Sequence, residues 1–221
     1  SSVGNTNMLS DYAAIKNGSY GKLMKAYYAK QDAEKLSGKG DTSQKLTLMK
    51  TSADSLKKSA DALNDSSLWE KKKIKKKDEK TGEEIEVEDY DWDKITKAVK
   101  SFVEDYNDVV KEAGESNTKD VLRNASWMTG MTDKNSNMLA KIGITIGKGN
   151  KLELDEDALK QADISSLKTV FTGYNSFVSK ISQKATGISN AANRASATYT
   201  NNGTYSKTDS SLTSSKIDKE V

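Results

Sequence analysis

Apolar residues recur along three stretches of the chain at alternating intervals of three and four residues. This heptad spacing places them on one face of an α-helix and is typical of helices that pack as coiled coils. It predicts helices over residues 46–63, from near residue 92 to about 109, and over about 170–199. Ordinary amphipathic helices show similar spacing over two turns, but for the first and third stretches we favour coiled-coil-like packing. The apolar positions are Leu46, Met49, Ala53, Leu56, Ala60 and Leu63, then Ile95, Val99, Phe102, Tyr106 and Val109, then Tyr174, Val178, Ile181, Ala185, Ile188, Ala192 and Ala195.

A highly charged segment, EKKKIKKKDEKTGEEIEVEDYD, separates the first two helices. Taken alone, the run KKKIKKK would suggest a nucleic-acid patch. The acids that follow favour a β-hairpin over residues 70–90, because folding about EKTGE places lysines opposite glutamates on one face and apolar residues on the other. The predicted pairs are Lys73–Glu88, Ile74–Val87, Lys75–Glu86, Lys76–Ile85 and Lys77–Glu84.

The stretch IGITIGKGNKLELDEDALKQAD contains glycines and clustered acids that could hold a phosphate or a metal. A phosphate loop needs a helix directly after its glycines, whereas here the alternating sequence LELD follows. We therefore predict a second hairpin over residues 142–154, with Gly149 and Asn150 at its tip. The acids that follow suit the first turn of a helix, with Asp155 as its N-cap.

The sequence DYDWD resembles the opening of a calcium-binding EF-hand loop but fails its later requirements. That loop needs glycine at its sixth position and glutamate at its twelfth. Lys94 and Lys100 stand there, so we interpret Asp91 as the N-cap of the second helix.

The remaining segments complete the predicted architecture. Residues 9–30 predict a broken helix, residues 41–43 offer N-caps for the helix that follows, and short helices are expected around 121–128 and 136–141. We predict a mainly α fold over residues 1–200, a single elongated antiparallel bundle with coiled-coil character and two small β-hairpins. Residues 201–221 are Ser/Thr-rich and predict a flexible tail.

Composition narrows the possible functions. The 221 residues include no cysteine, histidine or proline. Disulfides, thiol nucleophiles, most zinc sites and the commonest general base are therefore excluded. The formal charge of +3 is too small to indicate a nucleic-acid partner, and no run is long and apolar enough to insert into a membrane. We expect no enzyme, cofactor, metal or small-molecule substrate, because no acid and base share a spacing that implies one site.

Two motifs resemble those of a known family. The second helix reads ITKAVKSFVEDYNDVVKE, and its core, Phe102, Val103, Tyr106 and Asn107, resembles the helix that opens the C-terminal part of the flagellar filament-capping protein family, also called hook-associated protein 2. About thirty residues later the sequence resembles that family's next pattern at Leu139, Ile142, Gly143, Ile144, Thr145, Leu152, Leu154, Asp155, Glu156, Leu159, Ala162, Val170 and Phe171. The resemblance covers roughly residues 92–195. Cap proteins insert sizeable β-rich domains before the first motif, where this chain has only the Lys/Glu hairpin.

The resemblance implies a structural, non-enzymatic subunit of the bacterial flagellum, cap-like or hook-associated and extracellular. Its partners would be other copies of itself or other flagellar axial proteins, reached through helix-mediated assembly. An adhesin-like or ligand-binding helical module of the bacterial cell surface, using the hairpin or the tail, is the alternative. The candidate assembly seam, which could close within one chain or between chains, consists of Leu46, Leu56, Leu63, Phe102, Tyr106, Tyr174, Val178, Ile181 and Ile188.

Overall fold

The computed structural model describes residues 40–217, so the helix predicted over residues 9–30 lies outside the described residues. The described part is mainly α-helical and contains two small antiparallel sheets. Its helices are α3 (Ser43–Leu63), α4 (Trp92–Gly114), α5 (Lys119–Lys134), α6 (Ser136–Ala140), α7 (Glu156–Gln161), α8 (Ile164–Phe171) and α9 (Phe177–Ile217). Its strands are β1 (Lys72–Lys77), β2 (Glu84–Asp89), β3 (Ile144–Ile146) and β4 (Leu152–Leu154), and single 3-10 turns cover Ser66–Trp69 and Lys148–Asn150.

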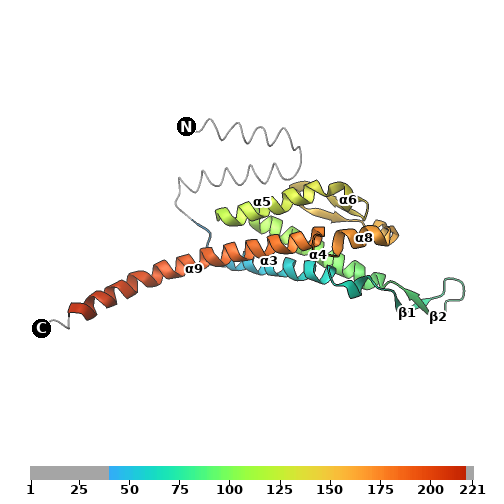
Figure 1. Cartoon of the computed structure of the whole chain (residues 1–221), viewed down its shortest axis with the longest axis horizontal. Helices are drawn as coiled ribbons and strands as arrows, with labels where there is room; N and C mark the ends of the chain where they lie inside the picture. The colour runs from blue at the N-terminus through green and yellow to red at the C-terminus, as the bar shows by residue number, and fades with distance from the viewer. Residues whose placement is uncertain (1–39, 218–221) are drawn as a thin grey trace, which may run out of the picture.

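Four helices, α3, α4, α5 and α9, form an elongated bundle in which the chain direction alternates (Figure 1). α3 packs against α4 and α9, and α5 packs against the same two helices, so the four surround a common core. The short elements α6 to α8 lie at one end and connect α5 to α9 (Figure 1). The predicted antiparallel bundle is confirmed.

The predicted caps fix where the helices begin. The Thr42 side chain accepts the backbone N–H of Lys45 at the start of α3. Asp91 caps α4 and Asp155 caps α7, each accepting a backbone N–H three residues later. These oxygens satisfy backbone donors that a helix leaves unpaired in its first turn. Neither acid therefore requires a metal to explain its position.

An aromatic cluster fills the core where the bundle meets its connecting elements. It unites all three phenylalanines of the chain with Trp69 and Tyr106. The Trp69 ring stacks on Phe171 at 5.5 Å between centroids, and its indole N–H donates to the carbonyl oxygen of Leu63 at 2.7 Å. The ring surface and the indole donor are both buried with partners, which suits an aromatic core residue.

The third predicted helix is interrupted, which corrects one expectation. The sequence pattern suggested a continuous helix from about residue 170, but α8 ends at Phe171 and α9 begins at Phe177. Gly173 has a φ of +101°, a left-handed conformation that glycine adopts without a steric penalty. Ser176 then accepts the backbone N–H of Ser179 and starts the new helix. Heptad spacing continues across this break, so periodicity could not reveal it.

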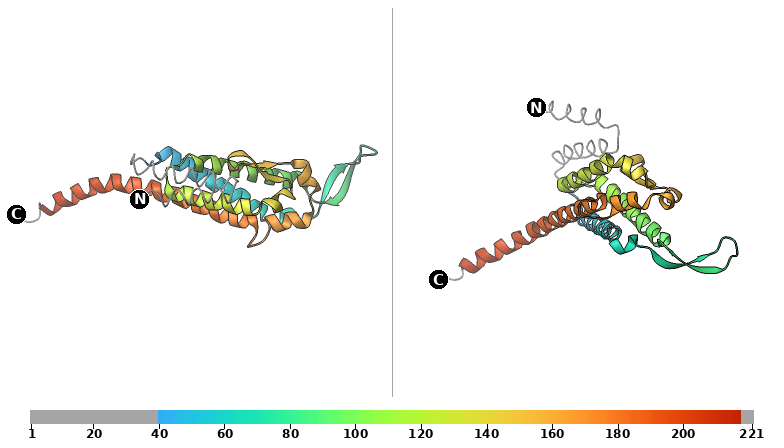
Figure 2. Two further views of the ribbon diagram at one scale, coloured as in Figure 1. Left: turned by 90° about the horizontal axis from the view of Figure 1, so that it is seen from above. Right: turned by 45° about the vertical axis from the view of Figure 1, so that its right-hand side comes forward.

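Both predicted hairpins are present. β1 pairs with β2 in the predicted register, from Lys73 opposite Glu88 to Lys77 opposite Glu84. β3 pairs with β4, and Gly149 and Asn150 connect them with φ values of +68°. The β1–β2 hairpin extends away from the helices in both views of Figure 2.

α9 is longer than the bundle. Its backbone continues as a helix to Ile217 and extends well past the other described elements (Figures 1 and 2). It crosses residue 200, where the sequence suggested the start of a tail. The mobility of residues 201–221 remains a prediction.

Candidate functional site

The first motif lies on α4, and its residues Phe102, Tyr106 and Asn107 each contact a different part of the fold. Phe102 is fully buried and its ring lies 6.4 Å from Phe171 and 6.3 Å from Phe177, between centroids. Tyr106 is also buried, and its hydroxyl donates to Thr132 Oγ1 on α5 at 2.8 Å. This burial raises the pKa of the Tyr106 phenol, which remains a neutral hydrogen-bond donor. The motif therefore builds the core and offers no reactive group.

Asn107 connects the first motif to the second. Its side-chain N–H₂ donates to the carbonyl oxygen of Leu152 at 2.9 Å, and its Oδ1 accepts the backbone N–H of Leu152 at 2.7 Å. The amide thus pairs with β4 as a neighbouring strand would, although Asn107 lies on a helix. The two motifs are coupled by direct contact between their residues.

Replacing Asn107 by alanine is expected to lower the free energy of unfolding by about 1–3 kcal/mol, because both backbone groups of Leu152 lose a partner. Urea denaturation followed by circular dichroism measures this change. Hydrogen exchange supplies a local readout, since the Leu152 amide should exchange faster in the variant. Asn193→Ala, on an exposed part of α9, is the matched control. Unchanged protection of the Leu152 amide would contradict the pairing.

The second motif folds tightly around Gly143. This residue has a φ of +88°, and a side-chain carbon added to it would lie 2.7 Å from the carbonyl oxygen of Asp155. The Gly143 carbonyl oxygen accepts the backbone N–H of Asp155 at 2.8 Å, while the Asp155 carboxylate caps α7. Gly143 and Asp155 therefore hold the β3–β4 hairpin against the first turn of α7.

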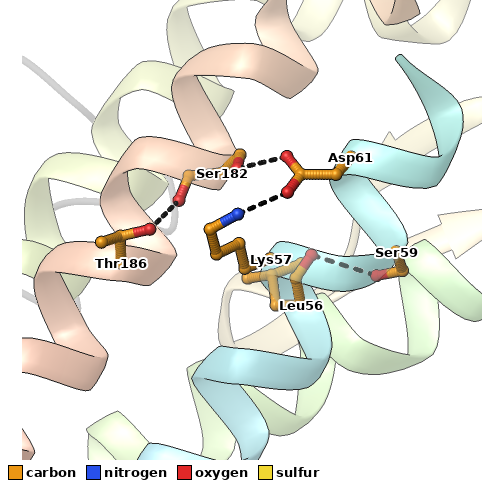
Figure 3. A network of polar contacts seen from close by, with 6 residues as sticks. All are labelled: Leu56, Lys57, Ser59, Asp61, Ser182 and Thr186. Atoms are coloured by element: carbon orange, nitrogen blue, oxygen red, sulfur yellow. Dashed lines mark hydrogen bonds and ion pairs between the residues drawn. The ribbon is translucent and has the colours of Figure 1, made fainter. Parts of the chain in front are cut away.

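Two matching polar clasps hold α3 against α9. In one, the Asp54 carboxylate accepts a hydrogen bond from the Ser189 hydroxyl at 2.6 Å and forms an ion pair with Lys50 at 2.8 Å. In the other, shown in Figure 3, Asp61 accepts from Ser182 at 2.6 Å and from Lys57 at 2.5 Å.

Each member of one clasp lies seven residues from its counterpart in the other. The clasps therefore repeat with the heptad and fix the register of the antiparallel pair. This is the established use of polar groups beside a helix seam.

The Ser182 hydroxyl gives a prediction that depends on pH. Partial burial alone would raise the pKa of Asp61, but the hydrogen bonds from Lys57 and Ser182 outweigh it and hold the pKa below its usual value. A carboxyl with a lowered folded-state pKa stabilises the fold above its unfolded pKa of about 3.9, and this contribution is lost as pH falls through the folded pKa.

We expect Ser182→Ala to lower the free energy of unfolding by about 0.5–1.5 kcal/mol near neutral pH. The cost should shrink as the pH falls below the unfolded pKa of about 3.9 and through the lower folded-state pKa, where Asp61 becomes protonated in the fold. Urea denaturation at several pH values measures both effects. Ser55→Ala, which removes a hydroxyl with no hydrogen bond among the described residues, is the control. A Ser182→Ala cost that is the same at both pH extremes would argue against the clasp.

A third polar junction lies at the opposite end of the bundle, where Asp41 meets the loop between α4 and α5. Its carboxylate accepts from the Ser116 and Thr118 hydroxyls, each at 2.6 Å, and from the backbone N–H of Asn117 at 2.7 Å. Burial would raise the pKa of Asp41, but these hydrogen bonds hold it below its ordinary value. The sequence suggested Asp41 only as a possible N-cap, because its partners lie more than 70 residues away.

The β1–β2 hairpin is the main charged feature outside the bundle. One face carries Lys73, Lys75, Lys77, Glu84, Glu86 and Glu88, and the other carries Lys72, Ile74, Lys76, Ile85, Val87 and Asp89. Lys76 pairs with Asp89 at 2.5 Å, and Lys73 lies 3.9 Å from Glu86. Neither Ile74 nor Val87 belongs to the bundle core.

The candidate seam closes within one chain for eight of its nine residues, which are at most 5% exposed: Leu46, Leu56, Leu63, Phe102, Tyr106, Val178, Ile181 and Ile188. The ninth residue, Tyr174, is 83% exposed, because it lies in the loop between α8 and α9. The Asn64 side chain holds that loop by accepting the backbone N–H of Gly173 at 2.8 Å. Whether the seam residues take part in assembly remains a prediction.

The polar residues beside the apolar seams were not predicted, because the predictions rested on the spacing of apolar residues. Asp54, Asp61, Ser182 and Ser189 carried a detectable signal, namely a repeat at the heptad interval in both helices. Among residues 40–217, no cluster of acidic side chains has the geometry of a metal site, and no helix is long and apolar enough to cross a membrane.

Comparison with known families gives one match. Residues 116–220 match the family model described as flagellar hook-associated protein 2 C-terminus. The matched range contains the second motif and α9, while the first motif precedes it in α4. Searches of curated proteins and of solved structures gave no match. The resemblance to the flagellar hook-associated protein 2 family found in the sequence is therefore confirmed over residues 116–220, which match the C-terminal part of that family.

Proposed function

We propose that this chain is a structural, non-enzymatic subunit of the bacterial flagellum, cap-like or hook-associated, that works outside the cell by assembling with axial subunits. The single observation that carries the proposal is the family match over residues 116–220. The same match favours the flagellum over an adhesin-like surface module, since the family is named for its association with the hook. The partners are other copies of the chain or other axial proteins.

The extension of α9 supports assembly through helices. Residues beyond about 198 continue the helix where no other described element lies beside it, and they fall within the matched range (Figure 1). Isolated helices are marginally stable in water, and most helical stability in proteins comes from packing against neighbours. A helix that leaves its own bundle is therefore suited to pack on another subunit.

Binding to assembled axial proteins tests the proposal. The full chain should co-sediment with purified flagellar hooks or filaments, and a chain ending at Thr198 should bind at least about tenfold more weakly. Circular dichroism and thermal unfolding of the shortened chain would establish that the bundle remains folded. Absence of binding by the full chain to hooks, filaments and their junction proteins would overturn the proposed function.

A further inference from the structure

The β1–β2 hairpin contributes little to the stability of the chain that carries it. No residue of either strand belongs to the buried core, and the ribbon extends away from the bundle (Figure 2). A two-stranded ribbon alone is marginally stable, and each exposed ion pair contributes only about 0.2–1 kcal/mol. The exposed side chains of Lys73 and Glu86, 80% and 59% accessible, leave both strands open to a partner.

Charge is segregated between the two strands. β1 carries five lysines and no acid, whereas β2 carries four acids and no lysine. Because the sheet has only these two strands, each has an outer edge without a neighbour in the described part of the chain. One edge of the ribbon is therefore basic and the other acidic.

The same edges present free backbone groups. The backbone N–H of Asp78 donates to the carbonyl oxygen of Glu83 at 2.8 Å, which identifies a hydrogen-bonded pair at the turn. Hydrogen-bonded pairs alternate along an antiparallel ladder. The backbone groups that point outwards consequently belong to Lys73, Lys75, Lys77, Glu84, Glu86 and Glu88.

The internal ion pairs leave part of this charge unmatched. Within the described residues, Lys75, Lys77, Glu84 and Glu88 have no opposite charge within 4.0 Å. Two copies of the β1 edge would place lysine beside lysine, and two copies of the β2 edge would place acid beside acid, both unfavourable. Charged side chains on exposed edges prevent such like-with-like pairing. Only pairing of β1 with β2 brings opposite charges together.

We propose that the hairpin is a self-complementary connector, in which the lysine-rich β1 edge of one copy pairs with the acid-rich β2 edge of a second copy of this chain. The inference rests on the proposed role as an assembling subunit and names the surface and its partner. Each copy uses two different edges, so the contact is head-to-tail and extends into a ring or an open chain. Ile74 of one copy then continues the apolar strip formed by Ile85 and Val87 of the next.

Charge exchange between the strands tests the connector in the full chain. An acidic variant carries Lys73→Glu, Lys75→Glu and Lys77→Glu, and a basic variant carries Glu84→Lys, Glu86→Lys and Glu88→Lys. Analytical ultracentrifugation over a concentration series should show association of the wild type that weakens at least about tenfold between about 0.05 and about 0.5 M salt. Each variant alone should remain monomeric, because both of its edges then carry one sign.

Two further samples keep the test independent of hairpin folding. An equimolar mixture of the acidic and basic variants should associate, and the chain carrying all six substitutions should associate as the wild type does. The connector is overturned by a monomeric wild type, by association of either variant alone at wild-type strength, or by a mixture that stays monomeric. A wild type that stays monomeric but binds heparin or anionic vesicles through β1 also overturns it. Hook and filament binding is measured separately, so loss of self-association with retained binding rejects the connector and leaves the proposed function intact.

Discussion

Replacing Phe102 by alanine is expected to lower the free energy of unfolding by about 3–5 kcal/mol, the cost typical of removing a buried phenylalanine. The ring is fully buried and contacts Phe171 and Phe177, which lie on either side of the break between α8 and α9. The substitution should therefore loosen the connecting elements as well as the bundle. Urea denaturation monitored by circular dichroism gives the free energy, and near-ultraviolet dichroism reports the order of the aromatic cluster.

Two further variants distinguish the loss of packing around Phe102 from a general sensitivity of the protein's stability to substitution. Phe102→Leu retains most of the apolar volume and should cost less than about 1.5 kcal/mol. Leu48→Ala removes a leucine that is 49% exposed and should change stability by less than about 0.5 kcal/mol. Equal costs for Phe102→Ala and Leu48→Ala would show that the aromatic cluster does not organise this fold.

Much of the architecture was predictable because its determinants are local. Heptad spacing located α3 and α4, and single acids marked the starts of two helices, Asp91 before α4 and Asp155 before α7. The register of β1 with β2 followed from the alternation of lysine with glutamate across one turn. Such signals extend over a few residues, and tertiary packing did not override them.

The break before α9 was not predictable, because it depends on contacts between distant segments. Tyr174 continues the heptad spacing of Val178 and Ile181, yet the chain turns outwards at this point. The Asn64 side chain, 109 residues away in sequence, binds both the N–H and the carbonyl oxygen of Gly173. Periodicity measures how well residues share one helix face and carries no information about such a remote bond.

The candidate assembly seam and its polar partners show the same division between features set by local sequence and features set by contacts between distant segments. The apolar seam residues were identified from spacing, but the choice between packing within one chain and packing between chains required the fold. Asn107 was part of a motif, yet its pairing with Leu152 joins residues 45 positions apart. The clasps required α3 and α9 to be placed side by side before Asp61 and Ser182 could be recognised as partners. Because the seams are buried, the hairpin and the extension of α9 become the stronger candidates for assembly.

Gly143→Ala is expected to lower the free energy of unfolding by about 2–4 kcal/mol. Two costs combine: a left-handed backbone conformation for alanine, about 1–2 kcal/mol, and the crowding of its side-chain carbon against fixed backbone. That carbon would lie 2.7 Å from the Asp155 carbonyl oxygen and 3.0 Å from the Leu159 nitrogen, so neither neighbour is a flexible side chain that could move aside. Because Gly143 also accepts the Asp155 N–H, any shift that relieves the overlap disturbs the start of α7.

Gly149→Ala is the matched control, because Gly149 shares the left-handed conformation, with a φ of +68°, but has open space around its added carbon. It should cost only the backbone contribution, about 1–2 kcal/mol. The difference between the two variants, measured by urea denaturation, isolates the contact between the β3–β4 hairpin and α7. Equal losses of unfolding free energy would mean that the backbone around Gly143 shifts at little cost. Glycine would then be required in the IGIT motif only for its left-handed conformation. A larger cost at Gly143, with faster hydrogen exchange at the Asp155 amide, is the result expected if the motif acts as a rigid junction.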